Sequence, residues 1–158
     1  MSLGSVFDIA GMGMGVQTVR LNTIASNIAN AETVAGSAEA AYRALHPVFV
    51  ARPPANNIAN KLVNNSDTPG IAFKGEADSV RASFGVMVSE IMRSERAPQR
   101  RHEPGHPLAD AQGYVYASNV NPVEEMADMI AASRSFQLNA EMANTAKSMM
   151  QRLLTLGQ

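Results

Sequence analysis

The sequence predicts an α+β fold, in which long N- and C-terminal helices pack as an antiparallel, coiled-coil-like pair, with a small, irregular β-rich middle segment at one end of the pair. Apolar residues recur every three or four positions near both ends of the chain, the spacing of an amphipathic helix. All prolines except Pro122 lie between these ends, together with short alternating runs that are typical of strands. The length of 158 residues suits one domain.

Composition excludes several kinds of protein. With a net charge of -1, the chain is not a strong electrostatic binder of nucleic acid or of anionic membranes. It has no cysteine, which excludes disulfides, thiolate metal sites and a cysteine nucleophile. It is poor in aromatic residues but has 10 methionines, a composition that favours closely packed helices. We expect no membrane-spanning helix and no cleaved secretory signal, since no long apolar run and no basic N-terminal region occur.

The first predicted helix covers residues 5–30. Three glycines between positions 11 and 15 each cost about 1 kcal/mol relative to alanine, so we expect the first turns to fray or to order on contact with a partner. Only three of the first 35 residues are charged, which indicates a helix that is covered on several sides. Its heptad-like apolar seam consists of Phe7, Ala10, Met14, Leu21, Ile24 and Ile28.

The middle of the chain reads as a small β unit with long loops. Strand-like runs are predicted at Tyr42–Val50, Ile71–Lys74, Phe84–Met92 and Tyr114–Ala117. Residues 51–82 are rich in proline and asparagine and are predicted to form a long loop or an insertion.

The last predicted helix covers residues 121–156. Asn121 is a good helix cap, Pro122 suits the first helical position, and Glu124 and Glu125 favour the positive end of the helix dipole. Gly157 ends it. Its apolar residues cover a broad face instead of one narrow seam, which predicts burial on several sides.

These elements divide the chain into a discontinuous helical unit, residues 1–33 with 120–158, and a β-rich segment, residues 34–119. Two helices cannot fully cover each other's broad apolar faces, so the apolar surface that remains exposed predicts association with further helices. Asparagine is a mediocre helix former, and its buried use in helices is to fix register. The candidates for this role are Asn22, Asn27, Asn30, Asn139 and Asn144.

Three local motifs suggest other chemistry, and each has a plainer interpretation. Residues 102–106, His-Glu-Pro-Gly-His, match the letters of a zinc-peptidase motif, but the proline and glycine interrupt the helix that this motif requires. The glycines at 11–15 lack the strand and lysine of a phosphate-binding loop. The arginines at 93–101 alternate with glutamates and lack stacking aromatics, which favours a solvated loop or a subunit contact over nucleic-acid binding. We predict no catalytic residues, cofactor or metal.

Residues 20–33, Arg-Leu-Asn-Thr-Ile-Ala-Ser-Asn-Ile-Ala-Asn-Ala-Glu-Thr, resemble the N-terminal signature of bacterial flagellar rod and hook axial proteins. Residues 103–121 and the last helix, 125–157, are similar to the corresponding parts of the proximal-rod family, flagellar basal-body rod protein C. The resemblance covers residues 5–50 and 82–158. The segment 51–82 departs from this resemblance, because it is longer than expected of the family.

The resemblance implies a structural, non-enzymatic subunit of the periplasmic flagellar rod, which is made in the cytoplasm and exported through the flagellar type III apparatus. Its implied partners are other rod proteins, copies of itself, the export apparatus and neighbouring basal-body components. No nucleic acid and no direct membrane insertion are expected. A zinc peptidase and a membrane-surface amphipathic helix are the alternatives. Subunit packing is assigned to Phe7, Met14, Leu21, Ile24, Ile28, Met126, Ile130, Phe136, Met150 and Leu153.

Overall fold

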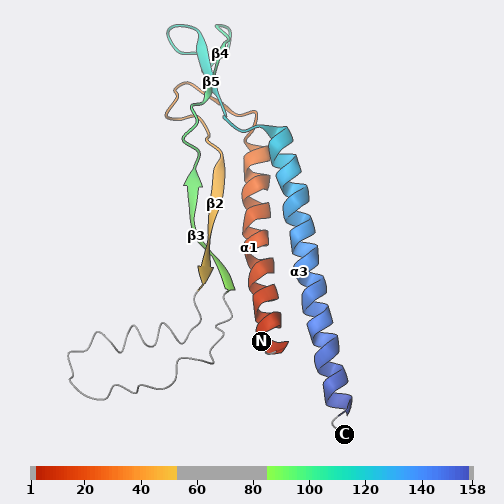
Figure 1. Cartoon of the computed structure of the whole chain (residues 1–158). Coiled ribbons are helices and arrows are strands. Elements are labelled where there is room, and N and C mark those ends of the chain that lie inside the picture. The colour runs from red at the N-terminus through yellow and green to blue at the C-terminus, as the bar shows by residue number, and fades with distance from the viewer. Residues whose placement is uncertain (1–2, 53–84, 157–158) are drawn as a thin grey trace, which may run out of the picture.

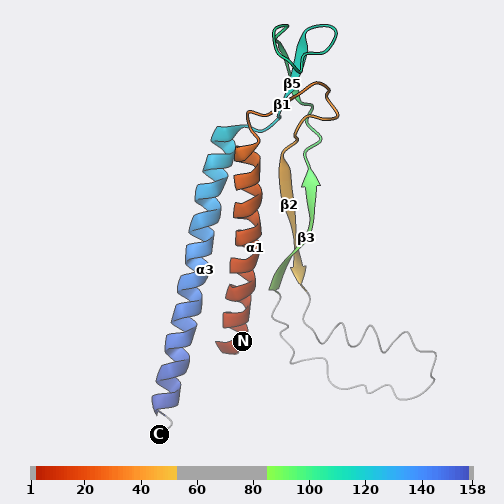
Figure 2. The same ribbon diagram turned by 180° about the vertical axis from the view of Figure 1, so that it is seen from behind.

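The computed structural model describes residues 3–52 and 85–156, and it confirms the α+β fold class. The N-terminal helix α1 (Leu3–Ala29) and the C-terminal helix α3 (Pro122–Leu156) run antiparallel, side by side (Figures 1 and 2). Both lie within two residues of the predicted bounds. The backbone N–H of Val123 donates to Asn121 Oδ1, so Asn121 caps α3 as expected. The longer α3 extends past the start of α1 (Figure 1).

Small side chains form the contact between the two helices. Of the described helices and strands, α3 packs against α1 only. Its buried apolar residues are alanines at positions 132, 143 and 146, and Ala10 is the buried counterpart near the start of α1. A Cβ atom on Gly13 would lie 2.9 Å from the side-chain amide of Asn139, so glycine is required where these helices approach closely. The glycines that weaken α1 in isolation therefore have different roles, and Gly13 is there because α3 packs closely against it.

A two-stranded antiparallel ribbon covers a second side of α1. It consists of β2 (Leu45–Arg52) and β3 (Gly85–Arg93), with a register irregularity between Val48 and Phe49. We expected the β unit at one end of the helix pair, but this ribbon runs along α1 (Figures 1 and 2). Met12 of α1 contributes to this contact, because its side chain occupies the space that a Cβ atom on Gly85 would need.

A three-stranded antiparallel sheet lies at the end of the helix pair where α1 ends and α3 begins (Figure 1). Its order is β1 (Val34–Ala35), β5 (Tyr114–Ala117) and β4 (Gln99–His102). The predicted and observed bounds of β5 coincide. β1 and β4 were not predicted. β1 has only two residues and β4 consists of four polar residues, so neither shows a period-two alternation of apolar and polar residues.

The arginine-rich segment is therefore partly a strand and not only a solvated loop. In β4 the guanidinium of Arg100 lies 4.6 Å from the centre of the Tyr114 ring, a cation–π contact. Arg101 pairs with Glu103 at 2.6 Å. The predicted strand at 71–74, and all but the first two residues of the predicted loop at 51–82, lie outside the described residues.

We predict that Gly13→Val lowers the free energy of unfolding by about 1–3 kcal/mol, because the added atoms enter the space of the Asn139 side chain. Gly11→Val is the matched control: a Cβ there meets no atom within 4 Å, so stability should change by less than about 0.5 kcal/mol. Urea unfolding followed by circular dichroism measures both. Equal effects of the two substitutions would show that Gly13 is not a packing position.

Candidate assembly interface

The side chain of Asn27 joins four parts of the chain. It is 0% exposed. Its Nδ2 donates to the carbonyl of Leu45 at 2.9 Å and to Oε1 of Glu125 at 3.0 Å. Its Oδ1 accepts from the Tyr42 hydroxyl at 3.0 Å and from the Leu45 backbone N–H at 2.9 Å. Every donor and acceptor of the amide is used, so α1, the start of β2, the loop before it and α3 meet at one residue.

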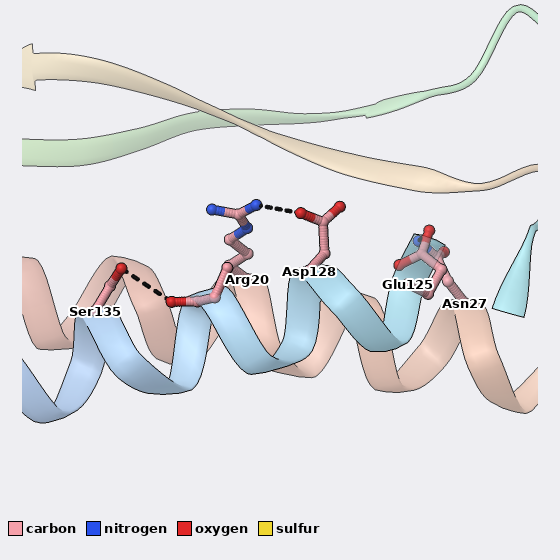
Figure 3. Close-up of polar contacts among 6 residues, drawn as sticks. Arg20, Asn27, Glu125, Asp128 and Ser135 are labelled. Carbon is pink, nitrogen blue, oxygen red and sulfur yellow. Dashed lines mark hydrogen bonds and ion pairs between the residues drawn. The ribbon is translucent and has the colours of Figure 1, made fainter. Parts of the chain in front are cut away.

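Glu125 is the buried partner of Asn27 on the first turns of α3 (Figure 3). It is 6% exposed. Burial raises the pKa of its carboxyl, although the hydrogen bond from Asn27 acts in the opposite direction. The sequence predicts that Glu125 favours a helix start but does not predict its burial, because a pattern of acidic residues does not show which one faces the neighbouring helix.

One ion pair bridges α1 and α3 further along the pair. Nη2 of Arg20 lies 2.8 Å from Oδ1 of Asp128 (Figure 3). Both side chains are partly exposed, so the pair contributes at most about 1 kcal/mol. Arg20, Glu125 and Asp128 also line a small cavity of about 260 Å³ beside β2.

Asn119 connects parts of the middle segment in the same way, although the sequence does not predict this role. Its Oδ1 accepts from the Ala44 backbone N–H and its Nδ2 donates to the carbonyl of Arg96, both at 2.7 Å. It is buried, just before α3 begins. An asparagine in a loop has many uses, so nothing in the sequence pattern singles it out.

The other asparagines proposed to set register lie elsewhere. Asn30 and Asn139 each donate to the carbonyl four residues earlier in the chain, at Ser26 and Ser135. Asn22 and Asn144 are exposed. Among the described residues, Asn27 is the one candidate of the five whose side chain forms a hydrogen bond to another helix.

The residues assigned to subunit packing fall into three groups by exposure. Ile24 is buried within the chain. A second group is half-buried and includes Met14, Leu21, Ile28, Phe136 and Met150. The third group is exposed and includes Phe7, Met126, Ile130 and Leu153.

An open, mostly apolar groove of about 520 Å³ adjoins the exposed apolar residues. Val6 near the start of α1 and Leu138, Met142 and Met149 of α3 contribute to its lining. Together, the groove and the exposed residues give α3 a large apolar surface that α1 leaves uncovered. Apolar surfaces of this extent mark sites of association.

The geometry does not support the zinc-peptidase alternative. His102 ends β4 and packs edge-on against the Tyr114 ring, whereas His106 lies in a turn and accepts from the Leu108 backbone N–H. The two histidines therefore do not share a helix face, as the motif requires. Within residues 3–52 and 85–156, no group of three or more potential ligands is placed to hold a metal. In the same residues, no helix has the length and hydropathy to cross a membrane.

We predict that Asn27→Ala lowers the free energy of unfolding by at least about 2 kcal/mol, because it leaves buried partners at Tyr42, Leu45 and Glu125 without their hydrogen bonds. Asn22→Ala, on the exposed side of the same helix, is the control and should change stability by less than about 0.5 kcal/mol. Urea unfolding of both variants measures this. Similar losses in the two would contradict a special role for Asn27.

A second prediction concerns pH. Because the pKa of Glu125 is raised in the folded chain, the folded state holds this proton more tightly than the unfolded state. The contribution of Glu125 to stability is therefore greatest below its unfolded pKa and is lost as pH rises through the raised folded pKa. Glu125→Gln keeps the acceptor for Asn27 but removes this titration.

Urea midpoints from about pH 4 to about pH 8 should therefore fall with rising pH for the wild type relative to Glu125→Gln. Asp110 acts in the opposite direction, since N–H donors from Tyr114 and Gln112 lower its pKa, but it is common to both proteins and cancels in the difference. Parallel curves for the two proteins would show that Glu125 does not titrate differently on folding.

Comparison with known proteins identifies the family. Residues 7–36 match the family model of flagella basal body rod proteins, and residues 111–156 match that of the C-terminal region of flagellar basal body rod FlgEFG proteins. Flagellar basal-body rod proteins FlgC of Escherichia coli O6:H1 and Salmonella typhimurium are 42% and 40% identical to this chain, with full coverage of both sequences. The FlgC of Borreliella burgdorferi is 33% identical, with 99% of its length covered. These matches confirm the resemblance found in the sequence: the chain belongs to the family of flagellar basal-body rod protein C.

Proposed function

We propose that this chain is a structural subunit of the bacterial flagellar basal-body rod and that it assembles helically through its terminal helices. One observation carries the proposal: α3 packs on α1 through alanines and leaves its large apolar residues exposed. Such a surface stabilises the protein only when neighbours cover it. The proposal assigns no catalytic activity to the chain.

Within this function, the exposed residues of the packing set lie between subunits. Phe7, Met126, Ile130 and Leu153 are each more than two-fifths exposed. Each buried side chain of this size contributes about 1.5–3 kcal/mol. Many such contacts, shared among neighbours, suit a shaft that transmits torque from motor to hook, because the load is divided over an extended interface.

In this proposal, the asparagines set the register between packed helices, and Asn27 sets it between α1 and α3. Its hydrogen bonds hold α1 and α3 at one alignment, and this alignment determines which apolar residues face outward. The helical unit, residues 1–33 with 120–158, supplies the assembling surface, and residues 34–119 form the separate β-rich segment.

Export by the flagellar type III apparatus, without a cleaved signal, completes the proposal. The chain would be made in the cytoplasm, pass through the apparatus unfolded and fold in the periplasmic rod beside other rod proteins and basal-body components. Its lack of cysteine is compatible with this route, since no disulfide has to be broken for the chain to unfold.

Deletion of the gene in its host tests the function. We expect the deletion strain to lose swimming, to lack intact rods in electron micrographs of basal bodies, and to recover both with the wild-type gene. In a second strain without a working export apparatus, the chain should stay in the cytoplasm. Normal swimming and intact rods in the deletion strain would overturn the proposed function, whereas periplasmic chain in the second strain would overturn only the export route.

A further inference from the structure

A row of large apolar side chains winds across the exposed surface of α3, and no described part of the chain covers it. Met126, Ile130, Leu138 and Met142 are 54%, 56%, 62% and 51% exposed. Arg134 occupies the position between Ile130 and Leu138 and is also exposed. Residues spaced by four form a ridge on the surface of a helix. We call residues 126, 130, 134, 138 and 142 the α3 ridge.

The exposed side of α1 is shallow, whereas the α3 ridge protrudes. Asp8, Gly11, Gly15, Thr18 and Asn22 follow one another at intervals of three and four, and all are exposed. We call them the outer face of α1. A Cβ atom on Gly11 or Gly15 would meet no atom within 4 Å. Glycine in an exposed helix lowers its stability relative to alanine, and here, unlike at Gly13, no contact within the described chain compensates.

The two surfaces also have complementary charge. Arg134 is the one charged residue of the α3 ridge, and Asp8 is the one charged residue of the outer face of α1. Neither forms an ion pair within residues 3–52 and 85–156. One chain therefore carries a ridge with a lone cation and a shallow face with a lone anion.

We propose that Met126, Ile130 and Arg134 of the α3 ridge of one copy pack against the outer face of α1 of a second copy, with Arg134 paired to Asp8. The inference rests on the proposed function and deepens it, because it names the two surfaces that join neighbouring subunits. Subunits of a rod point the same way, so α3 of one copy runs antiparallel to α1 of the next. With Arg134 beside Asp8, Ile130 then lies over Gly11 and Met126 over Gly15.

The alignment of the helices within one chain keeps Asp8 and Arg134 of the same copy apart. Gly13 faces Asn139 and Arg20 faces Asp128, so Arg134 lies about two helical turns from the level of Asp8. A contact between them requires a neighbour displaced by about 12 Å along the helix axis. Because the two surfaces differ, each new copy again presents one free surface of each kind, and the assembly stays open-ended.

Charge reversal tests the pair in the deletion strain. Asp8→Arg and Arg134→Asp should each reduce the number of intact rods about fivefold, because each places like charges across the contact. The double variant Asp8→Arg with Arg134→Asp restores the opposite charges and should recover the rods. Glu39→Arg, a reversal in the loop before β2, is the control and should have no effect.

Cysteine cross-linking tests the identity of the partner, since the chain has no cysteine of its own. Asp8→Cys and Arg134→Cys, expressed as two separate chains in one deletion strain and oxidised, should give a disulfide-linked pair in isolated basal bodies. Glu39→Cys with Arg134→Cys should give none. Mass spectrometry of the linked peptides shows whether both come from this chain.

The outcomes separate the contact from the proposed function. If single charge reversals leave the rods intact while the gene deletion removes them, the contact is wrong and the function stands. A cross-link from position 8 or 134 to a different protein, or none in functional rods, would likewise overturn pairing between copies. Three results together would establish the contact between copies: loss of intact rods in both single variants, recovery of rods in the double variant, and a cross-link between two copies.

Discussion

The buried amide of Asn27 is the interaction on which the rest of the structure depends. An amide side chain offers two donors and two acceptor positions, and here all are used by partners from β2, the preceding loop and α3. A shift of α3 along α1 would break the bond to Glu125 and leave polar groups buried without partners, a cost of about 1–3 kcal/mol for each neutral group. The alignment of the two helices is therefore specified by hydrogen bonds, which the small side chains between them could not do alone.

That alignment determines what lies inside and what lies outside. It places Gly13 against Asn139 and the alanines of α3 against α1, so the helices approach closely with little apolar volume between them. Close approach through small residues leaves the bulky ones on the other sides of each helix. The exposed methionines and leucines of α3, and its one isoleucine, Ile130, thus follow from the same geometry that makes the helix pair stable in one register.

The sequence predicted the long elements well because helix caps and apolar periodicity are local signals. Both helices and the strand Tyr114–Ala117 were predicted within two residues of their observed bounds. The path of the β2–β3 ribbon along α1 was not predicted, since it depends on tertiary contacts such as that between Met12 and Gly85. Burial of Glu125 was missed for a similar reason: an acidic residue in a first helical turn is normally solvated, and only the partner at Asn27 explains its position.

The candidate interface could be predicted in kind but not residue by residue. Apolar residues cover more of the circumference of each helix than a single partner helix can bury, because two helices cannot cover each other on all sides. The sequence therefore predicts further partner helices. Which of those residues remain exposed depends on the rotation of each helix, and a broad apolar face does not specify it. Ile24 and Ile130 look equivalent as letters in a helical pattern, yet one is 4% exposed and the other 56%. In this chain, polar groups such as Asn27 specify the rotation and apolar groups supply the surface, so a few hydrogen bonds inside the subunit decide which contacts are left for its neighbours.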